Sequence, residues 1–244
     1  MPLVPNDYAT HVKRAVAHYW QTLERQSKRQ RKGDADRGAR AAVTGGKQMD
    51  GFCSLVTWLL TENDMPEASI YIQAELTLPG YYRPTKKWDM LVVHDGHLVA
   101  ALEFKSQRGP SFGNNFNNRA EEAIGTATDL WEAYEKGAFG VEHPRPWLGW
   151  VMLLEDCKGS TGAVGVDEPH FPVFPEFKGS SYAKRYELIL RKLVLKKLFD
   201  GSSLLMSTEK AGPRGGYAEP AADLSMKKFL AGLAGHARTY KASL

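Results

Sequence analysis

Apolar side chains recur every three to four residues in five segments of the chain, which is the spacing of one face of an α-helix. These segments begin near residues 7, 50, 118, 182 and 224. Asn6 or Asp7 can cap the first segment, and Asn118 with Glu121 has the form of a capping box at the start of the third. The pattern therefore predicts five helices.

Short apolar runs typical of β-strands occur at residues 70–78, 88–93, 98–105, 147–154 and 204–206. Asp95-Gly96 separates the second run from the third, and such a dipeptide marks a tight turn between antiparallel strands. The two runs are therefore predicted to form a β-hairpin. The order of helices and strands predicts one α/β domain over residues 1–244, with a central mixed β-sheet flanked by helices.

The composition is ordinary for a globular protein, with 43% hydrophobic and 25% charged residues. No segment has the length of a membrane span or the pattern of a secretion signal. We therefore expect a cytoplasmic protein without a membrane partner. The two cysteines, Cys53 and Cys157, lie far apart and predict reduced thiols, and the histidine spacing shows no zinc motif.

The net charge of +4 is modest, but its distribution is uneven. Basic side chains gather at Arg25, Lys28, Arg29, Arg31, Lys32, Arg37 and Arg40. Such a run is usually a solvated face or a loop, and it also attracts a phosphate backbone. Because the run continues into a Gly/Ala-rich stretch, we predict a mobile basic loop over about residues 26–46.

Two acids and a lysine stand inside the predicted hairpin, at Asp89, Glu103 and Lys105. Because strand side chains alternate, Glu103 and Lys105 share a face and Phe104 points to the other. Two carboxylates can hold a hard divalent cation, and a lysine can orient a water or stabilise charge on a phosphate. This combination suits phosphodiester cleavage. The alternative is a solvated ion pair, since a Glu-x-Lys triplet at a strand end is common.

The hairpin register decides whether the two acids can meet. A plain two-residue turn pairs His94 with His97 and leaves Asp89 and Glu103 on opposite faces. A shared metal site requires one residue of offset, which a three-residue loop over residues 94–96 with a G1 bulge supplies. A bulge elsewhere in either strand serves the same end. We therefore predict an odd loop or a bulge between the acids.

The segment after Lys105 is rich in hydrogen-bonding side chains. These are Gln107, Arg108, Asn114, Asn115, Asn117, Asn118 and Arg119. Asparagine pairs with adenine and arginine with guanine in the major groove of DNA. Each asparagine alone is better explained as a turn or cap residue, and Asn118 as a helix cap. For the segment as a whole, predicted to be a polar loop up to residue 118, we expect contact with the substrate.

These segments resemble the XhoI family of type II restriction endonucleases. The matching stretches are residues 83–93 (RPTKKWDMLVV), 101–107 (ALEFKSQ) and 109–119 (GPSFGNNFNNR), and residues 46–51 and 129–131 also fit. The similarity covers nearly the whole chain. It implies a restriction-endonuclease-like PD-(D/E)xK fold with Asp89, Glu103 and Lys105 as the motif residues. Trp88 stands where the usual pattern has a proline, which does not affect the chemistry.

The resemblance further implies Mg²⁺ dependence, a homodimer on double-stranded DNA, and the palindromic target CTCGAG, cut after the first C of each strand. It also implies a cognate DNA methyltransferase, without a stable complex. Asp50 and Glu75 are further candidate metal ligands, although Asp50 also suits a first helical turn electrostatically. Lys86 and Lys87 are candidate phosphate contacts, with solvated strand-end charges as the equal alternative.

Two other functions compete with a nuclease. A sequence-specific DNA-binding protein with a nuclease-like fold would bind without cleaving, but the complete set of Asp89, Glu103 and Lys105 argues against it. A glycosidase would use two carboxylates and no lysine, which the Asn- and Arg-rich surroundings disfavour.

Overall fold

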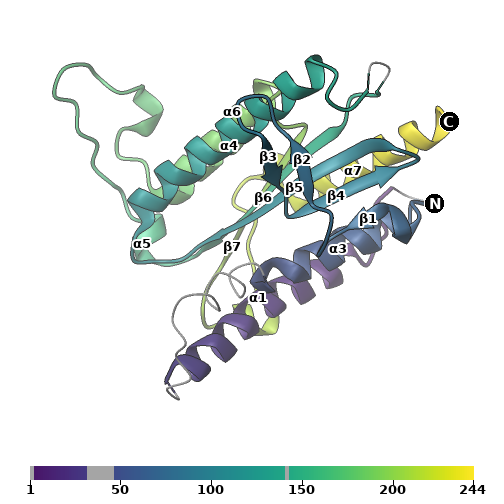
Figure 1. The fold of residues 1–244 in the computed structure, drawn as a ribbon. Coiled ribbons are helices and arrows are strands. Elements are labelled where there is room, and N and C mark those ends of the chain that lie inside the picture. The colour runs from purple at the N-terminus through teal and green to yellow at the C-terminus, as the bar shows by residue number, and fades with distance from the viewer. Residues whose placement is uncertain (1–2, 32–46, 141–142) are drawn as a thin grey trace.

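The computed structural model describes residues 3–31, 47–140 and 143–244 (Figure 1). A five-stranded sheet with the order β1-β4-β5-β6-β7 forms its centre. β1, β4 and β5 are antiparallel, whereas β5, β6 and β7 are parallel, so the predicted mixed sheet is confirmed. The bounds are Ile70–Tyr71 for β1, Met90–His94 for β4, His97–Gln107 for β5, Trp147–Glu155 for β6 and Gly201–Ser207 for β7.

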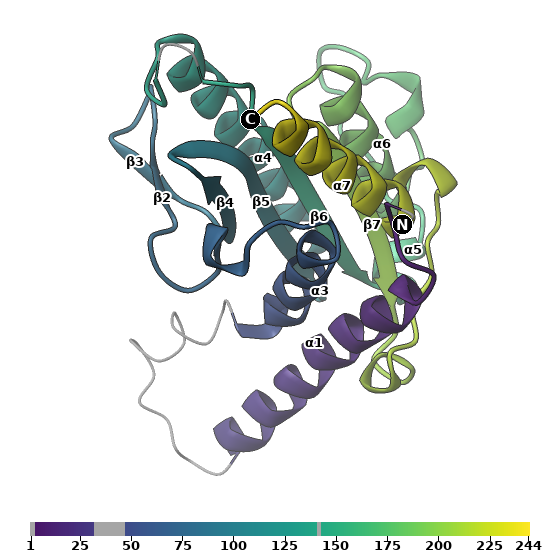
Figure 2. The same ribbon diagram turned by 90° about the vertical axis from the view of Figure 1, so that its right-hand side faces the viewer.

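Helices cover both faces of this sheet, as predicted (Figures 1 and 2). α1, α3 and α7 pack on one face, in a core that includes Val16, Phe52 and Phe229. α4 and α6 pack on the other face, in a core that includes Leu130 and Leu190. The bounds are Tyr8–Arg31 for α1, Asp50–Thr61 for α3, Phe112–Glu135 for α4, Lys158–Thr161 for α5, Tyr182–Leu195 for α6 and Met226–Ala242 for α7. Of the helices described, none has the length and apolar character needed to cross a membrane.

The strand predicted at residues 70–78 is instead two short strands in different sheets. β1 pairs with β4, but the chain then bends, and Glu75 takes a positive φ of 56°. Such a left-handed residue cannot continue an extended strand. Thr77–Pro79 then forms β2, which pairs with β3, Thr85–Lys87, in a separate two-stranded sheet.

The β4–β5 hairpin has a regular two-residue turn. His94 pairs with His97, and the turn residues Asp95 and Gly96 have φ values of 48° and 78°. Positive φ at both central positions is the geometry of a type I′ turn, which suits the twist of a hairpin. The predicted three-residue loop is therefore wrong.

The predicted offset between the strands is nevertheless present, as a bulge in β5. Val92 pairs with Ala100 and Val93 pairs with Leu98, so Val99 has no partner in β4. Because β5 has one extra residue, each β5 side chain beyond the bulge lies on the opposite face of the sheet from where a regular hairpin would place it relative to β4. Continuing the register one step past the last pair of the ladder sets Asp89 opposite Glu103, on one face of the sheet.

α4 begins earlier than predicted, because the Asn-rich segment forms its first two turns instead of a loop. The helix starts at Phe112, so Asn118 is not its cap. Two aromatic contacts hold this part of α4 against α6, with ring centroids 5.8 Å apart for Phe112 and Tyr182 and 5.1 Å apart for Phe116 and Tyr186. Tertiary packing thus outweighs the weak helix propensity of asparagine.

The basic segment is also more helical than predicted. α1 continues to Arg31, so residues 26–31 belong to a helix and not to a loop. The remainder of the predicted mobile loop, residues 32–46, lies outside the described residues. α6 ends at Leu195, before the predicted residue 199, and Lys197 beyond it has a positive φ of 57°.

Asp129 of α4 anchors the loop between β2 and β3. Its Oδ1 accepts hydrogen bonds of 2.8 Å from the amides of Tyr81 and Tyr82, and its Oδ2 accepts one of 2.8 Å from Nε of Arg83. Burial disfavours ionisation of this carboxyl, but the bonds from Tyr82, Arg83 and Tyr81 outweigh it and lower its pKa. Gly80 is required here, since a Cβ at that position would lie 2.5 Å from Asp129 Oδ2.

We expect Asp129→Ala to lower the free energy of unfolding by about 2–4 kcal/mol, because hydrogen bonds to a charged group are the strong ones. Asp129→Asn, which keeps an acceptor for the two amides, should cost less than half as much. Because the folded-state pKa is lowered, the stabilisation by Asp129 is present above the unfolded pKa of about 3.9 and disappears as the pH falls through the folded value. Urea unfolding at pH 7 and pH 3 measures both effects. A loss below about 1 kcal/mol for Asp129→Ala at pH 7 would contradict the anchoring role.

Candidate active site

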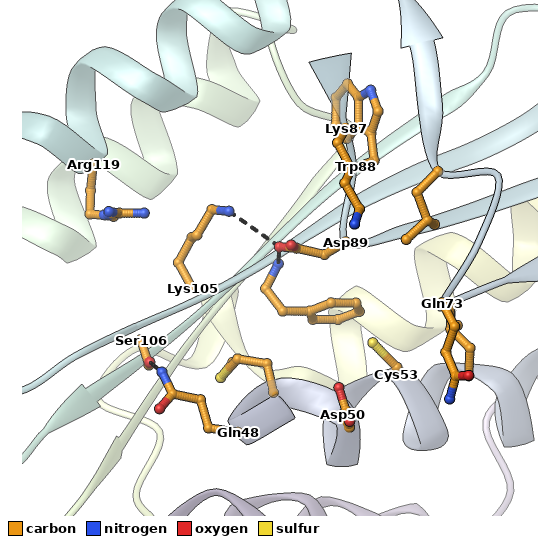
Figure 3. Close-up of a pocket in the computed structure, with 14 residues that line it drawn as sticks. Gln48, Asp50, Cys53, Gln73, Lys87, Trp88, Asp89, Lys105, Ser106 and Arg119 are labelled. Atoms are coloured by element: carbon orange, nitrogen blue, oxygen red, sulfur yellow. Dashed lines mark hydrogen bonds and ion pairs between the residues drawn. The ribbon is translucent and has the colours of Figure 1, made fainter. Parts of the chain in front are cut away.

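The three predicted catalytic residues meet where β4 and β5 separate. β4 begins at Met90, whereas β5 continues through Glu103 and Lys105 alongside β6. Lys105 Nζ lies 3.2 Å from Asp89 Oδ2 and forms an ion pair with Glu103 Oε2. Asp89 Oδ2 also accepts a 2.8 Å hydrogen bond from the amide of Phe104 (Figure 3). One ammonium group therefore bridges both carboxylates.

Burial and charge together set the ionisation of this cluster. Glu103 is only 4% exposed. Burial raises the pKa of Glu103, and the negative charge of Asp89 raises it further, while Lys105 and Lys86 oppose the shift. For Lys105, burial alone would lower the pKa, but Glu103 and Asp89 outweigh it and raise the pKa. The two carboxylates repel each other, and the two ammonium groups offset only part of the upward shift at Glu103.

A cavity of about 400 Å³ opens in front of Asp89 and Lys105. α3 contributes Asp50 and Cys53 to its wall, and α4 contributes Arg119 from the other side (Figure 3). Burial, with the charges of Asp89 and Asp50, raises the pKa of the Cys53 thiol to about 12. The wall thus presents carboxylate oxygens and a protonated thiol beside Lys105.

The donor atoms at Asp89 and Glu103 fit a hard divalent cation. A cation bound between the two carboxylates would relieve their repulsion. Mg²⁺ prefers oxygen ligands, which both side chains supply. Within the described ranges, no three His, Cys, Asp or Glu side chains gather closely enough to hold a metal. One or two carboxylates, completed by water and substrate phosphates, are a usual arrangement for Mg²⁺ in phosphoryl-transfer sites.

The two additional candidate ligands are placed differently. Asp50, in the first turn of α3, lines the cavity, and burial raises its pKa against the opposing charges of His18 and Lys47. It does not join the two acids in a three-ligand group. Glu75 is exposed, has a left-handed backbone and is not among the residues lining the cavity. The break in the predicted strand removes it from the site, and we do not propose it as a ligand.

The candidate DNA contacts of α4 divide between two sides of the helix. Asn114, Asn117 and Asn118 are exposed and lie at helical spacings of three and four residues, so they form one stripe. Asn115 is half-buried, on the same side as Arg119. Arg119 faces the cavity and pairs with Glu122 at 2.6 Å.

Gln107 is a correction to the predicted set. It is 3% exposed, its Nε2 donates a 2.9 Å hydrogen bond to the carbonyl of Phe112, and its Oε1 accepts from the hydroxyl of Tyr186. Both polar ends are thus used inside the protein, where they join β5 to α4 and α6. We therefore assign Gln107 to packing and do not propose it as a DNA contact.

The other basic candidates lie around the cavity or near α1. Lys87 is exposed and lines the cavity, whereas Lys86 points to Glu103 and forms an ion pair with it. Arg108 is part-exposed, with its guanidinium 5.2 Å from the ring centroid of Trp20 and an ion pair of 3.8 Å to Glu209. Of the basic run, Arg25 and Lys28 are exposed on α1, whereas Lys32, Arg37 and Arg40 lie outside the described residues.

Sequence reasoning missed three polar residues of the cavity wall: Gln48, Gln73 and Ser106 (Figure 3). Gln48 precedes α3 and donates a 3.3 Å hydrogen bond to Ser106 of β5. Gln73 stands in the bend that replaces the predicted strand. The available signal was the position of Gln48 inside the matching stretch 46–51, whereas nothing in the local pattern distinguishes Gln73.

Comparisons with known proteins agree with this geometry. The family model for restriction endonuclease XhoI matches residues 28–219. The type II restriction enzyme BstVI of Geobacillus stearothermophilus is 53% identical over 209 residues, covering 84% of this chain and 93% of the relative. The chain is also 50% identical over 196 residues to the type II restriction enzyme XhoI of Xanthomonas vasicola, a match that covers 78% of this chain and 77% of the relative. It is 52% identical over 173 residues to the type II restriction enzyme AbrI of Azospirillum brasilense, which covers 70% of this chain and 77% of the relative. No solved structure matches. The chain belongs to the XhoI family of type II restriction endonucleases.

Proposed function

We propose that this type II restriction enzyme hydrolyses double-stranded DNA at the palindrome CTCGAG, after the first C of each strand, with Mg²⁺ as cofactor. The observation that carries the proposal is the contact of Lys105 with both Asp89 and Glu103, within a chain 50–53% identical to type II restriction enzymes. The target sequence and the cut position rest on the resemblance of the motif-bearing segments to the XhoI family.

The chemistry assigns a separate role to each of the three residues. Asp89 and Glu103 would hold Mg²⁺, which when bound polarises the phosphoryl oxygen and lowers the pKa of a water. Lys105 then orients the attacking water and stabilises the charge that develops on the phosphate. Arg119, on the opposite wall, is proposed to contact a backbone phosphate. Asp50 is retained only as a ligand acting through water, because it does not complete a three-ligand group.

Sequence recognition is assigned to α4. Asn114, Asn117 and Asn118 present amides on one exposed stripe, and an α-helix fits the major groove, where asparagine reads adenine. Lys87, Arg108 and the basic end of α1 are proposed to contact phosphates, which add affinity without specificity. Asn115 is proposed as a secondary contact at the edge of the cavity.

A homodimer follows from the symmetry of the target, because each subunit then reads one half-site and cuts one strand. We further propose that the enzyme acts in the cytoplasm, beside a cognate methyltransferase that protects host DNA without forming a stable complex with it. Sedimentation of the protein alone and with a CTCGAG duplex tests the dimer. A protein that sediments as a monomer in both conditions argues against it.

A plasmid digest tests the function. Incubation with a sequenced plasmid in Mg²⁺ should give fragments whose ends map to CTCGAG, and EDTA should abolish the cutting. The same plasmid with its CTCGAG sites mutated is the control, and it should remain intact. Specific binding without any cutting in Mg²⁺ would instead favour the alternative, a non-cleaving DNA-binding protein. If the fragment ends map to another palindrome, the assignment as a type II restriction enzyme stands, but CTCGAG is not the target.

A further inference from the structure

Glu103 forms ion pairs with two lysines, Lys105 and Lys86. Lys105 belongs to the proposed catalytic motif, whereas Lys86 does not. Lys86 of β3 forms an ion pair with Glu103 Oε1, while Lys105 of β5 pairs with Oε2. The ammonium of Lys86 also donates a 3.1 Å hydrogen bond to the carbonyl of Lys87 and lies 4.8 Å from the ring centroid of Trp88. Both oxygens of a nearly buried carboxylate are therefore occupied by ammonium groups from different sheets.

The formal charges of the four side chains in this cluster sum to zero in the DNA-free protein. Asp89 and Glu103 supply two negative charges, and Lys86 and Lys105 supply two positive charges. A divalent cation that enters this cluster must compete with an ammonium for the oxygens of Glu103, and it adds two uncompensated positive charges. Attraction between charges is strong around the nearly buried Glu103, so the competition has a large effect on cation affinity.

Lys86 has space into which it can turn. A second cavity, of about 330 Å³, lies beside it on the α4 side of Glu103. Cationic side chains predominate on its walls, with Arg83, Lys86, Lys105 and Arg119 against Glu103 and Glu122. Such a wall attracts a backbone phosphate of DNA, and the flexible stem of a lysine lets its ammonium move from a carboxylate to a phosphate without a change in the backbone.

We propose that Lys86 is a positioning residue that couples metal binding to DNA binding. In the free protein it neutralises Glu103 and keeps cation affinity low. On DNA its ammonium transfers to a backbone phosphate, and Glu103 becomes available to the cation. This inference rests on the proposed function, because it assigns Glu103 to the metal. Its consequence is an enzyme whose metal site is completed only on DNA.

The first test measures a cation on the DNA-free protein. Tb³⁺ luminescence, excited through tryptophan, reports binding directly, and competition with Mg²⁺ shows whether the two cations use the same site. Lys86→Met should raise Tb³⁺ affinity about tenfold, within the usual range of such couplings. Lys136→Met, which removes the same charge from an exposed position just beyond the end of α4, is the matched control and should change affinity less than twofold. Lys86→Arg, which keeps the positive charge, should bind Tb³⁺ as weakly as the wild type does. If Lys86→Met does not fold, Lys86→Gln takes its place in the experiment.

The second test measures the coupling from the DNA side. Duplex affinity is determined by fluorescence anisotropy in EDTA and in Ca²⁺, a cation chosen so that the duplex is not cut. The gain in affinity from Ca²⁺ should fall in Lys86→Met relative to the wild type, because coupling between two ligands is reciprocal.

Two outcomes overturn the inference: equal effects of Lys86→Met and Lys136→Met on Tb³⁺ affinity, or no effect of either. If this happens while the wild type cuts plasmid DNA, the inference fails and the proposed function stands. A wild-type protein that binds no duplex in either EDTA or Ca²⁺ refutes the proposed function instead.

Discussion

Lys105→Ala is expected to reduce DNA cleavage about 10³-fold while leaving duplex affinity within about threefold of the wild type. The reason is geometric. Lys105 Nζ contacts the carboxylates of both Asp89 and Glu103, which places it at the proposed metal site and away from the exposed stripe of α4. On the proposed mechanism, its loss removes the group that orients the water and stabilises charge on the phosphate. Single-turnover cleavage of a CTCGAG duplex, with anisotropy in Ca²⁺ for affinity, measures both quantities.

Lys136→Ala is the matched control for Lys105→Ala. Lys136 is exposed just beyond the C-terminal end of α4, so its removal takes the same charge from the protein without touching the site. Cleavage by this variant should match the wild type. Near wild-type cleavage by Lys105→Ala in Mg²⁺ would refute the catalytic assignment, and a complete loss of duplex binding would make Lys105 a binding residue.

The second large effect is expected on specificity. Alanine at Asn114, Asn117 or Asn118 should lower discrimination at one base pair of the target by about 1–3 kcal/mol for at least one of the three positions. The expectation follows from their common exposed stripe on α4. Anisotropy in Ca²⁺ with a set of duplexes, each carrying one substitution in CTCGAG, measures the discrimination base by base.

Arg119→Ala provides the contrast for this experiment. Arg119 lines both cavities beside Lys105 and is not part of the exposed stripe. It should therefore weaken binding to all the duplexes to a similar extent, as the loss of a phosphate contact does. If the three asparagine variants behave in the same uniform way, α4 does not read the sequence through this stripe.

The sequence predicted the parts of the site that follow from local periodicity. Alternation along β5 placed Glu103 and Lys105 together and Phe104 in the opposite core, and the structure agrees. The offset required between Asp89 and Glu103 was also predictable, because it is a question of parity. Its position was not predictable, since the unpaired residue Val99 lies in a uniformly apolar run where every register buries similar side chains.

The remaining errors arise from tertiary contacts that local patterns do not contain. The early start of α4 depends on the packing of Phe112 against Tyr182 and of Phe116 against Tyr186, about 70 residues further along the chain. The break after β1 depends on the left-handed backbone of Glu75. The sequence has no glycine or proline at that position, so the local pattern did not predict the break. The pairing of Lys86 with Glu103 requires the small second sheet, which the sequence pattern did not predict.

The bulge at Val99 limits how this stretch of chain can change in evolution or in engineering. Inserting or deleting a single residue between Asp89 and Glu103 would turn one carboxylate to the opposite face, even where the new residue is a conservative apolar one. Changes of two residues would preserve the facing. Among relatives with an intact enzyme, the spacing of fourteen positions between the acids should therefore vary only in even steps, unless a bulge is gained or lost with the odd residue. An alignment gap of one in this segment is thus a sign of altered chemistry or of a compensating bulge.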